Sequence, residues 1–319
     1  MNSKAFVELA LNSLSCSQKK LAARLGVSPT QISKWKNGDY MSHEMERRFR
    51  EILNIDDMDP SFILMAGSFE DAKKWKKLIQ QLAKWALDSA ETGYETEPLS
   101  DDNELLCWQT FSVLRDMGIK LPSKFPEELN INCDADPDEA DEVFSSLIEG
   151  NPHASLIDKI FHSLNDVYGF YAAYVSPLVW DEQLDLMDTD AQNIEPSLLW
   201  LAASKVDVDM KFAPKIGEFR YRVTKDFDEW LAIVKDKAFR SGVPLRAELA
   251  SLAHRPPGEL GHQAEAESLG INDSRLHPDI YMNELLVGMR AIHQVLPAIM
   301  KKLEIHEEFE LDTSEFYSQ

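Results

Sequence analysis

The sequence predicts a mainly α-helical fold, with a small helical bundle at the N-terminus and a larger helical domain that contains one β-hairpin at about residues 206–223. Apolar residues recur at intervals of three and four along much of the 319-residue chain, as amphipathic helices require. A convincing alternation of apolar and charged residues, which is typical of a half-buried strand, is confined to the region of the hairpin.

Residues 17–38 predict two short helices joined by a sharp turn. A serine can cap the first helix and a glycine stops it, and Ser28 and Pro29 can begin the second helix about three residues later. Ile32 and Trp35 are three apart and therefore share the face that packs on the first helix. The opposite face carries hydroxyl, amide and ammonium groups, which can hydrogen-bond base edges and phosphates.

A family resemblance rests on a set of positions within this stretch: Gln18, Leu21, Ala22, Leu25, Gly26, Val27, Ser28, Ile32, Ser33, Trp35, Asn37 and Gly38. The segment resembles the helix-turn-helix of the phage repressor and Cro family, also called the xenobiotic-response-element (XRE) family. The resemblance covers about the first fifty-five residues and implies that the second helix enters the major groove of DNA. Pro29 departs from the pattern, because family members often have a base-reading polar side chain there.

The resemblance also implies roles for individual side chains. Thr30, Gln31 and Lys34 are expected to read bases, and Ser33 lies on the same outward face. Those expected to hold phosphates are Gln18, Ser28 and Asn37. The alternative is an ordinary two-helix corner of an all-helical protein.

Charge is unevenly distributed along the chain. The net charge is −22; residues 1–84 hold 14 Lys or Arg against 10 Asp or Glu (+4), and the remainder holds 19 against 45 (−26). The basic part therefore contains the predicted DNA-binding motif. An acidic remainder would repel the phosphate backbone and disfavour non-specific binding, although acidity can equally serve solubility alone.

The chain divides into three predicted parts. Residues 1–66 would form the DNA-binding domain, 67–90 an amphipathic connecting helix, and 104–319 a helical regulatory or interaction domain, with the acidic stretch 89–103 as a linker. The connecting helix carries Trp75 on an apolar stripe, which would pack on the chain's own core or form a dimer seam.

A further helix is predicted from Ser42. It carries Arg47, Arg48 and Arg50, which would contact phosphate or only be solvated.

The predicted hairpin pairs two alternating runs, 206–212 and 218–223. Pairing residues whose numbers sum to 429 places opposite charges across from each other on one face: Asp207 with Arg222, Asp209 with Arg220, and Lys211 with Glu218. The other face would be buried.

Other candidate sites are weak. Residues 253–278 predict a long mobile loop in which the spacing of His254 and His262 matches no standard metal motif. The acidic stretch at 133–142 lacks the glycine and terminal glutamate of a calcium loop. The three cysteines are far apart, so neither a disulfide framework nor a zinc site is expected, and no cofactor is expected.

The sequence therefore predicts a sequence-specific transcription regulator, a repressor that binds double-stranded DNA as a homodimer. Its C-terminal domain would sense a ligand, oligomerise or bind a partner. An antitoxin-like or defence-linked interaction protein is the alternative. An enzyme is not expected, because no nucleophile elbow or phosphate loop is found and only the residues between His254 and Glu267 offer acid–base chemistry. No apolar run approaches a membrane span and the N-terminus lacks a signal-peptide core, so a cytoplasmic location is expected.

Overall fold

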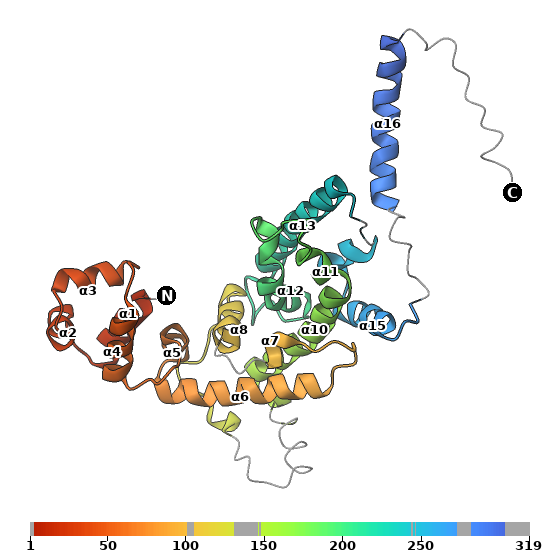
Figure 1. Ribbon diagram of the computed structural model, residues 1–319. Coiled ribbons are helices and arrows are strands. Elements are labelled where there is room, and N and C mark those ends of the chain that lie inside the picture. Colours follow the sequence, from red (N-terminus) through yellow and green to blue (C-terminus); the bar gives the residue numbers. More distant parts are fainter. Residues whose placement is uncertain are drawn as a thin grey trace.

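The computed structural model describes residues 3–100, 105–130, 146, 148–243, 245, 247–272 and 282–303. These residues form helices and turns and contain no β-strand, so the mainly α-helical class is confirmed. None of the described helices is long and apolar enough to cross a membrane. An N-terminal lobe, a long connecting helix and a larger helical body follow one another, and the last helix extends away from the body (Figure 1).

Five helices form the N-terminal lobe: α1 (Ser3–Ser13), α2 (Gln18–Leu25), α3 (Pro29–Lys36), α4 (His43–Leu53) and α5 (Pro60–Ala66). Their core centres on Phe49 of α4, which is fully buried. The Phe49 ring lies 5.8 Å from the ring of Phe6 on α1 and 6.0 Å from that of Trp35 on α3. Aromatic side chains therefore fix the positions of α1, α3 and α4 relative to one another.

Helix α6 (Phe69–Asp88) leads from this lobe to the body and runs along the lower edge of both in Figure 1. Its predicted apolar stripe is buried within the chain. The ring of Trp75 meets those of Phe111 and Phe125 edge-on at 5.3 and 5.0 Å, and Trp85 is half-buried against the same core. The stripe packs on the chain's own core and is not free to act as the dimer seam considered above.

The body contains the remaining helices. They are α7 (Glu97–Ser100), α8 (Leu105–Asp116), α10 (Pro152–Tyr174), α11 (Ser176–Val179), α12 (Leu198–Lys205), α13 (Ile216–Ser241), α14 (Ser251–His254) and α15 (Pro257–Ser268), with short 3-10 turns at Glu127–Leu129, Asp190–Asn193, Glu195–Ser197 and Ala247–Ala250. Helix α10 is buried along most of its length between α6, α12 and α15. Helix α16 (Met282–Lys302) follows the body.

The described part of the predicted linker is packed against the body. Thr92, Thr96 and Leu99 are buried, and Thr92 faces Gly169 of α10 so closely that a β-carbon on Gly169 would lie 2.6 Å from that of Thr92. The missing side chain of a glycine in α10 makes this approach possible. Residues 89–100 are therefore a packed connection and not a solvated linker.

The predicted β-hairpin is wrong. Residues 210–215 form turns and Ile216 begins the long helix α13, whose buried residues Phe219, Val223 and Phe227 follow a helical spacing. Tyr221, expected on the buried face, is 72% exposed. Residues four apart, such as Phe219 and Val223, lie on one face in a strand and in a helix alike, so the alternating pattern favoured the wrong structure.

The charge pairs expected in the hairpin do not form either. The guanidinium of Arg220 donates to the carbonyl oxygens of Ser204 and Val206, at 2.9 and 2.7 Å, and Arg222 pairs with Asp116 on α8 at 3.2 Å. Both arginines join α13 to neighbouring helices.

The long loop predicted at 253–278 is also wrong over its described part, because α15 occupies residues 257–268. Leu260 and Ala264 are buried one turn apart, and Gly261 lets α15 approach Asp166 of α10 closely. Small residues allow this close helix packing. Because the segment has few large apolar side chains, its sequence shows no clear helical spacing, and the helix was not predicted. The acidic stretch at 133–142 lies outside the described residues.

Candidate nucleic-acid interface

The two helices predicted in residues 17–38 are confirmed, with the predicted caps. The Ser17 hydroxyl accepts a hydrogen bond from the backbone N–H of Lys20 at 3.4 Å, and α2 ends at Gly26 in a left-handed conformation (φ +69°). Ser28 caps α3 by accepting from the N–H of Gln31 at 3.2 Å, and Pro29 occupies the first turn. The caps therefore set the short connection between α2 and α3.

The inner face of α3 fixes its orientation. Ile32 is fully buried and Trp35 is 5% exposed, as the spacing predicted. The indole N–H of Trp35 donates to the carbonyl oxygen of Tyr40 at 3.0 Å, while its ring meets the edge of Phe49. Helix α3 is thereby held against α4 and its polar side faces outward. Gly38 has a positive φ (+96°) beyond the helix end, whereas Asn37 stays right-handed (φ −88°).

The predicted DNA-binding side chains lie together on α3 and at the start of α2. Those that are exposed are Ser28, Thr30, Ser33, Lys34 and Asn37, and those that are half-buried are Gln18 and Gln31. The Ser33 hydroxyl donates to Oε1 of Gln18 at 3.3 Å, which joins the two helices. Since the Ser28 oxygen accepts the cap bond, its hydroxyl hydrogen is free to donate.

This segment has an unusual charge pattern. Residues 17–38 contain five cations and no carboxylate: Lys19, Lys20, Arg24, Lys34 and Lys36. All five are exposed, and none has an ion pair with the described residues. Unpaired cations keep their full attraction for phosphate, which is what the electrostatic part of DNA binding requires.

The arginines of α4 differ in this respect. Arg47 and Arg48 pair with carboxylates on their own helix at 3.7 and 2.8 Å, and Arg50 pairs with Glu46 at 3.3 Å. Arg50 also donates to the carbonyl oxygens of Asp56 and Met58, both at 2.9 Å. Arg50 therefore holds the connection that follows α4, which is a structural role.

Lys19, Lys20 and Arg24 were not among the predicted site residues. Their signal was present in the sequence, because no carboxylate lies within the motif to neutralise them. Tyr40, just after α3, is 73% exposed, and its carbonyl oxygen accepts the hydrogen bond from Trp35. It has no distinguishing sequence pattern.

The side chains between His254 and Glu267 form separate pairs and not one cluster, and His262 Nδ1 lies 3.7 Å from Oε2 of Glu265. His254 Nε2 lies 2.8 Å from Asp228 Oδ1 on α13, Arg255 pairs with Glu259 at 2.6 Å, and the His262 side chain is 85% exposed. The described residues contain no group of three His, Cys, Asp or Glu placed to hold a metal ion.

Comparison with known proteins identifies the N-terminal segment. Residues 7–42 match the family model described as Helix-turn-helix, and this match runs from α1 to the N-cap of α4. No curated protein and no solved structure matches the chain. With its caps, buried anchor and outward polar face, the segment is an XRE-type helix-turn-helix, a DNA-binding motif.

Proposed function

We propose that the protein is a sequence-specific transcription regulator, a repressor, that reads DNA through α3. The observation that carries the proposal is the outward face of α3 and α2, where hydroxyl, amide and unpaired ammonium groups lie together on a helix-turn-helix. Thr30, Gln31 and Lys34 would contact base edges. Phosphates would be held by Gln18, Ser28 and Asn37, while Ser33 would keep Gln18 in position.

A homodimer fits this function. Helix-turn-helix proteins commonly bind two half-sites one helical turn apart, so that the two-fold symmetry of the operator mirrors that of the protein. Each copy would then place its α3 in one major groove.

The body would regulate the motif by sensing a ligand, by oligomerising or by binding a partner. A cleft of about 410 Å³ lies between α8, α12 and α13, and its lining includes Trp108, Trp200 and Trp230. Aromatic clefts of this size are typical of small-molecule sites. Helix α8 also contacts the N-terminal lobe, since Arg115 lies 3.7 Å from the sulfur of Met65 on α5. A change at the cleft could reach the lobe through α8.

The experiment is a binding assay with a library of random DNA duplexes. Lys34→Ala is expected to weaken binding by about 1–3 kcal/mol and to alter the preferred base at one position. Lys84→Ala is the matched control, because it removes an exposed lysine from α6. Equal affinity and equal base preference for wild type and Lys34→Ala would disprove base reading by Lys34.

A second candidate is an antitoxin-like or defence-linked role, which the charge of −26 on residues 85–319 favours. Such a surface suits a basic protein partner. Recovery of a defined basic protein with the full chain, lost above about 0.5 M salt, would support this role.

A further inference from the structure

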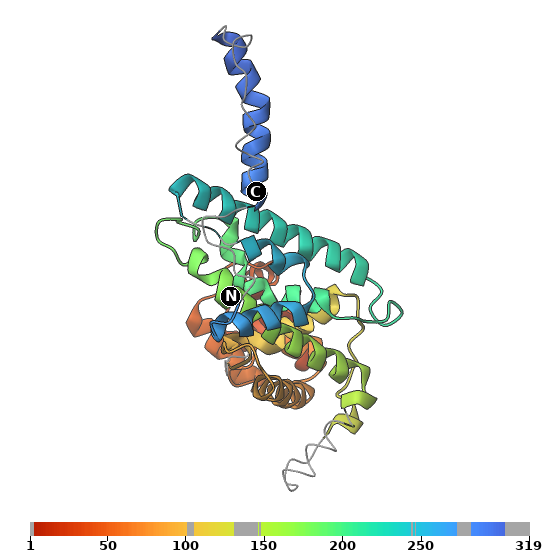
Figure 2. The ribbon, with the colours of Figure 1, turned by 90° about the vertical axis from the view of Figure 1, so that its right-hand side faces the viewer.

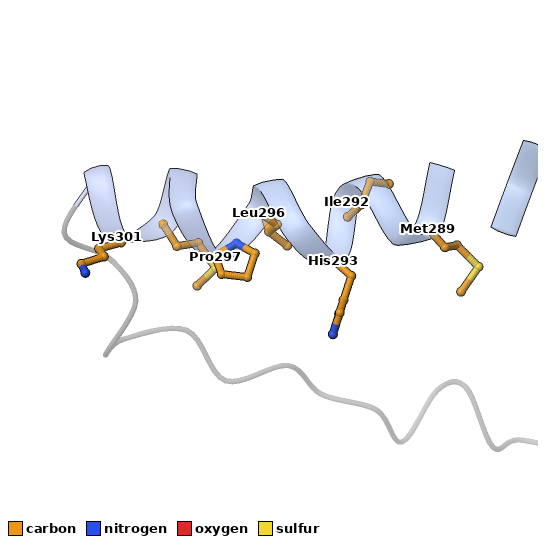
Figure 3. A pocket seen from close by; sticks show the side chains of 7 residues that line it. Met289, Ile292, His293, Leu296, Pro297 and Lys301 are labelled. Atoms are coloured by element: carbon orange, nitrogen blue, oxygen red, sulfur yellow. The ribbon is translucent and has the colours of Figure 1, made fainter. Parts of the chain in front are cut away.

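Helix α16 carries a stripe of exposed apolar side chains. The helix extends away from the body in two perpendicular views (Figures 1 and 2). Met289, Ile292, Leu296, Ile299 and Leu303 are 44–62% exposed. Figure 3 shows Met289, Ile292 and Leu296 on this helix, with His293 next to Ile292 and Pro297 just after Leu296. An apolar stripe of this length on a polar protein marks an interaction surface.

The spacing of the stripe indicates what covers it. The apolar residues alternate in steps of three and four over the whole helix: Met282, Leu285, Met289, Ile292, Leu296, Ile299 and Leu303. This is a seven-residue repeat with both core positions apolar, a period of 3.5 residues that supercoils a helix around others with the same period. A second copy of this chain supplies such a helix with its stripe in the same register.

The residue types at the two core positions indicate how many copies assemble. Leu296 and Leu303 occupy the first core position of the repeat, and Ile292 and Ile299 occupy the second. Leucine at the first position with isoleucine at the second shifts the preference from two strands to three or four. Val295, which flanks the core, is 52% exposed, and a narrow two-stranded seam would leave it in water.

We propose that α16 joins four copies of the chain in a four-stranded coiled coil. The choice of four over three rests on the proposed function, because helix-turn-helix motifs act in pairs and a trimer would leave one motif unpaired. The tetramer presents two pairs of α3 helices, so that one assembly can hold two operators. Pro297 falls outside the core and flanking positions of the repeat, so its ring does not enter the seam, although the helix lacks one backbone hydrogen bond there.

The test is the mass of the full chain in solution without DNA, by sedimentation equilibrium. Wild type is expected at four times the chain mass of 36.3 kDa. Ile292→Lys puts a charge in the seam and is expected to abolish the tetramer. Gln294→Lys puts the same charge two residues away, at an exposed position outside the core, and is expected to leave the tetramer intact.

A second variant keeps the helix apolar throughout. Leu296→Ile and Leu303→Ile combined with Ile292→Leu and Ile299→Leu exchange the two residue types, which favours two strands, so this variant is expected to be a dimer. A wild-type monomer or dimer, or a tetramer that survives Ile292→Lys, would overturn the proposal. Because mass is measured without DNA, these results leave the proposed reading of DNA by α3 standing. Conversely, a tetramer without DNA affinity would contradict only the proposed function.

Discussion

Ser33 on α3 donates a hydrogen bond to Oε1 of Gln18 on α2 across 3.3 Å. This bond uses the acceptor of the Gln18 amide and leaves its two N–H donors available. It also joins the helix proposed to read bases to the helix proposed to hold phosphate. The two roles are therefore linked through one pair of side chains.

Ser33→Ala is expected to weaken binding to all DNA sequences by a similar factor, about two- to tenfold, because Gln18 loses its positioning partner and Ser33 reads no base in this account. Gln18→Ala should weaken binding at least as much. Affinities measured on a preferred site and on a scrambled site check this. A change in base preference on Ser33→Ala would instead place Ser33 against a base edge.

Trp35→Ala is expected to destabilise the protein by about 3–5 kcal/mol, because it leaves a cavity beside Phe49 and frees the carbonyl of Tyr40. Trp35→Phe should cost less, since a ring remains. Denaturant unfolding of both variants measures the difference. If the two variants unfold at the same denaturant concentration, an aromatic ring beside Phe49 does not contribute to stability as expected.

Gly169→Ala is expected to destabilise the body by about 1–3 kcal/mol, because the added β-carbon would lie 2.6 Å from Thr92. Gly258→Ala is the matched control, since nothing lies within 4 Å of a β-carbon there, and it should be neutral or slightly stabilising. Thermal unfolding compares the two. Equal stability of both variants would mean that residues 89–100 are not held against α10.

Asp166 makes stability depend on pH. Burial raises the pKa of its carboxyl to about 6, with His162 opposing the shift and Glu91 adding to it. The unfolded chain loses this proton near pH 4, so the folded state binds more protons between about pH 4 and 6. The contribution of Asp166 to stability therefore falls as pH rises through this window.

Asp166→Asn should remove this dependence and stabilise the protein at pH 7 by about 1–2 kcal/mol, after allowance for the partial exposure of the carboxyl. Unfolding measured from pH 4 to 7 tests it, with exposed Asp188→Asn as the control. If stability depends on pH in the same way for Asp166→Asn and for wild type, Asp166 has the same pKa in the folded and unfolded states.

The N-terminal lobe was predictable because its signals are local. Ser28, Pro29 and Gly26 specify a helix end and a helix start within a few residues, and Ile32 with Trp35 specifies the buried face. Capping and short-range spacing do not depend on distant parts of the chain. The five unpaired cations could also have been read from the sequence, because the motif lacks carboxylates.

The body was less predictable because its elements depend on distant contacts. Phe219 and Val223 fit a strand and a helix equally over a short window, and the position of α13 is set by Arg220 and Arg222 binding neighbouring helices. Small residues on α15, such as Gly261, allow close packing against α10, and this role is visible only once the position of α10 is known. Thr92 looked like part of a linker because its partner, Gly169, is far away in sequence.

Footprinting of the full chain on the DNA upstream of its own gene tests directly whether α3 reads DNA sequence. We expect protection of an inverted repeat whose half-sites lie about one helical turn, roughly 10 bp, apart, and loss of that protection in Lys34→Ala but not in Lys84→Ala. Uniform protection of all sequences, or the same footprint for both variants, would contradict sequence reading by α3.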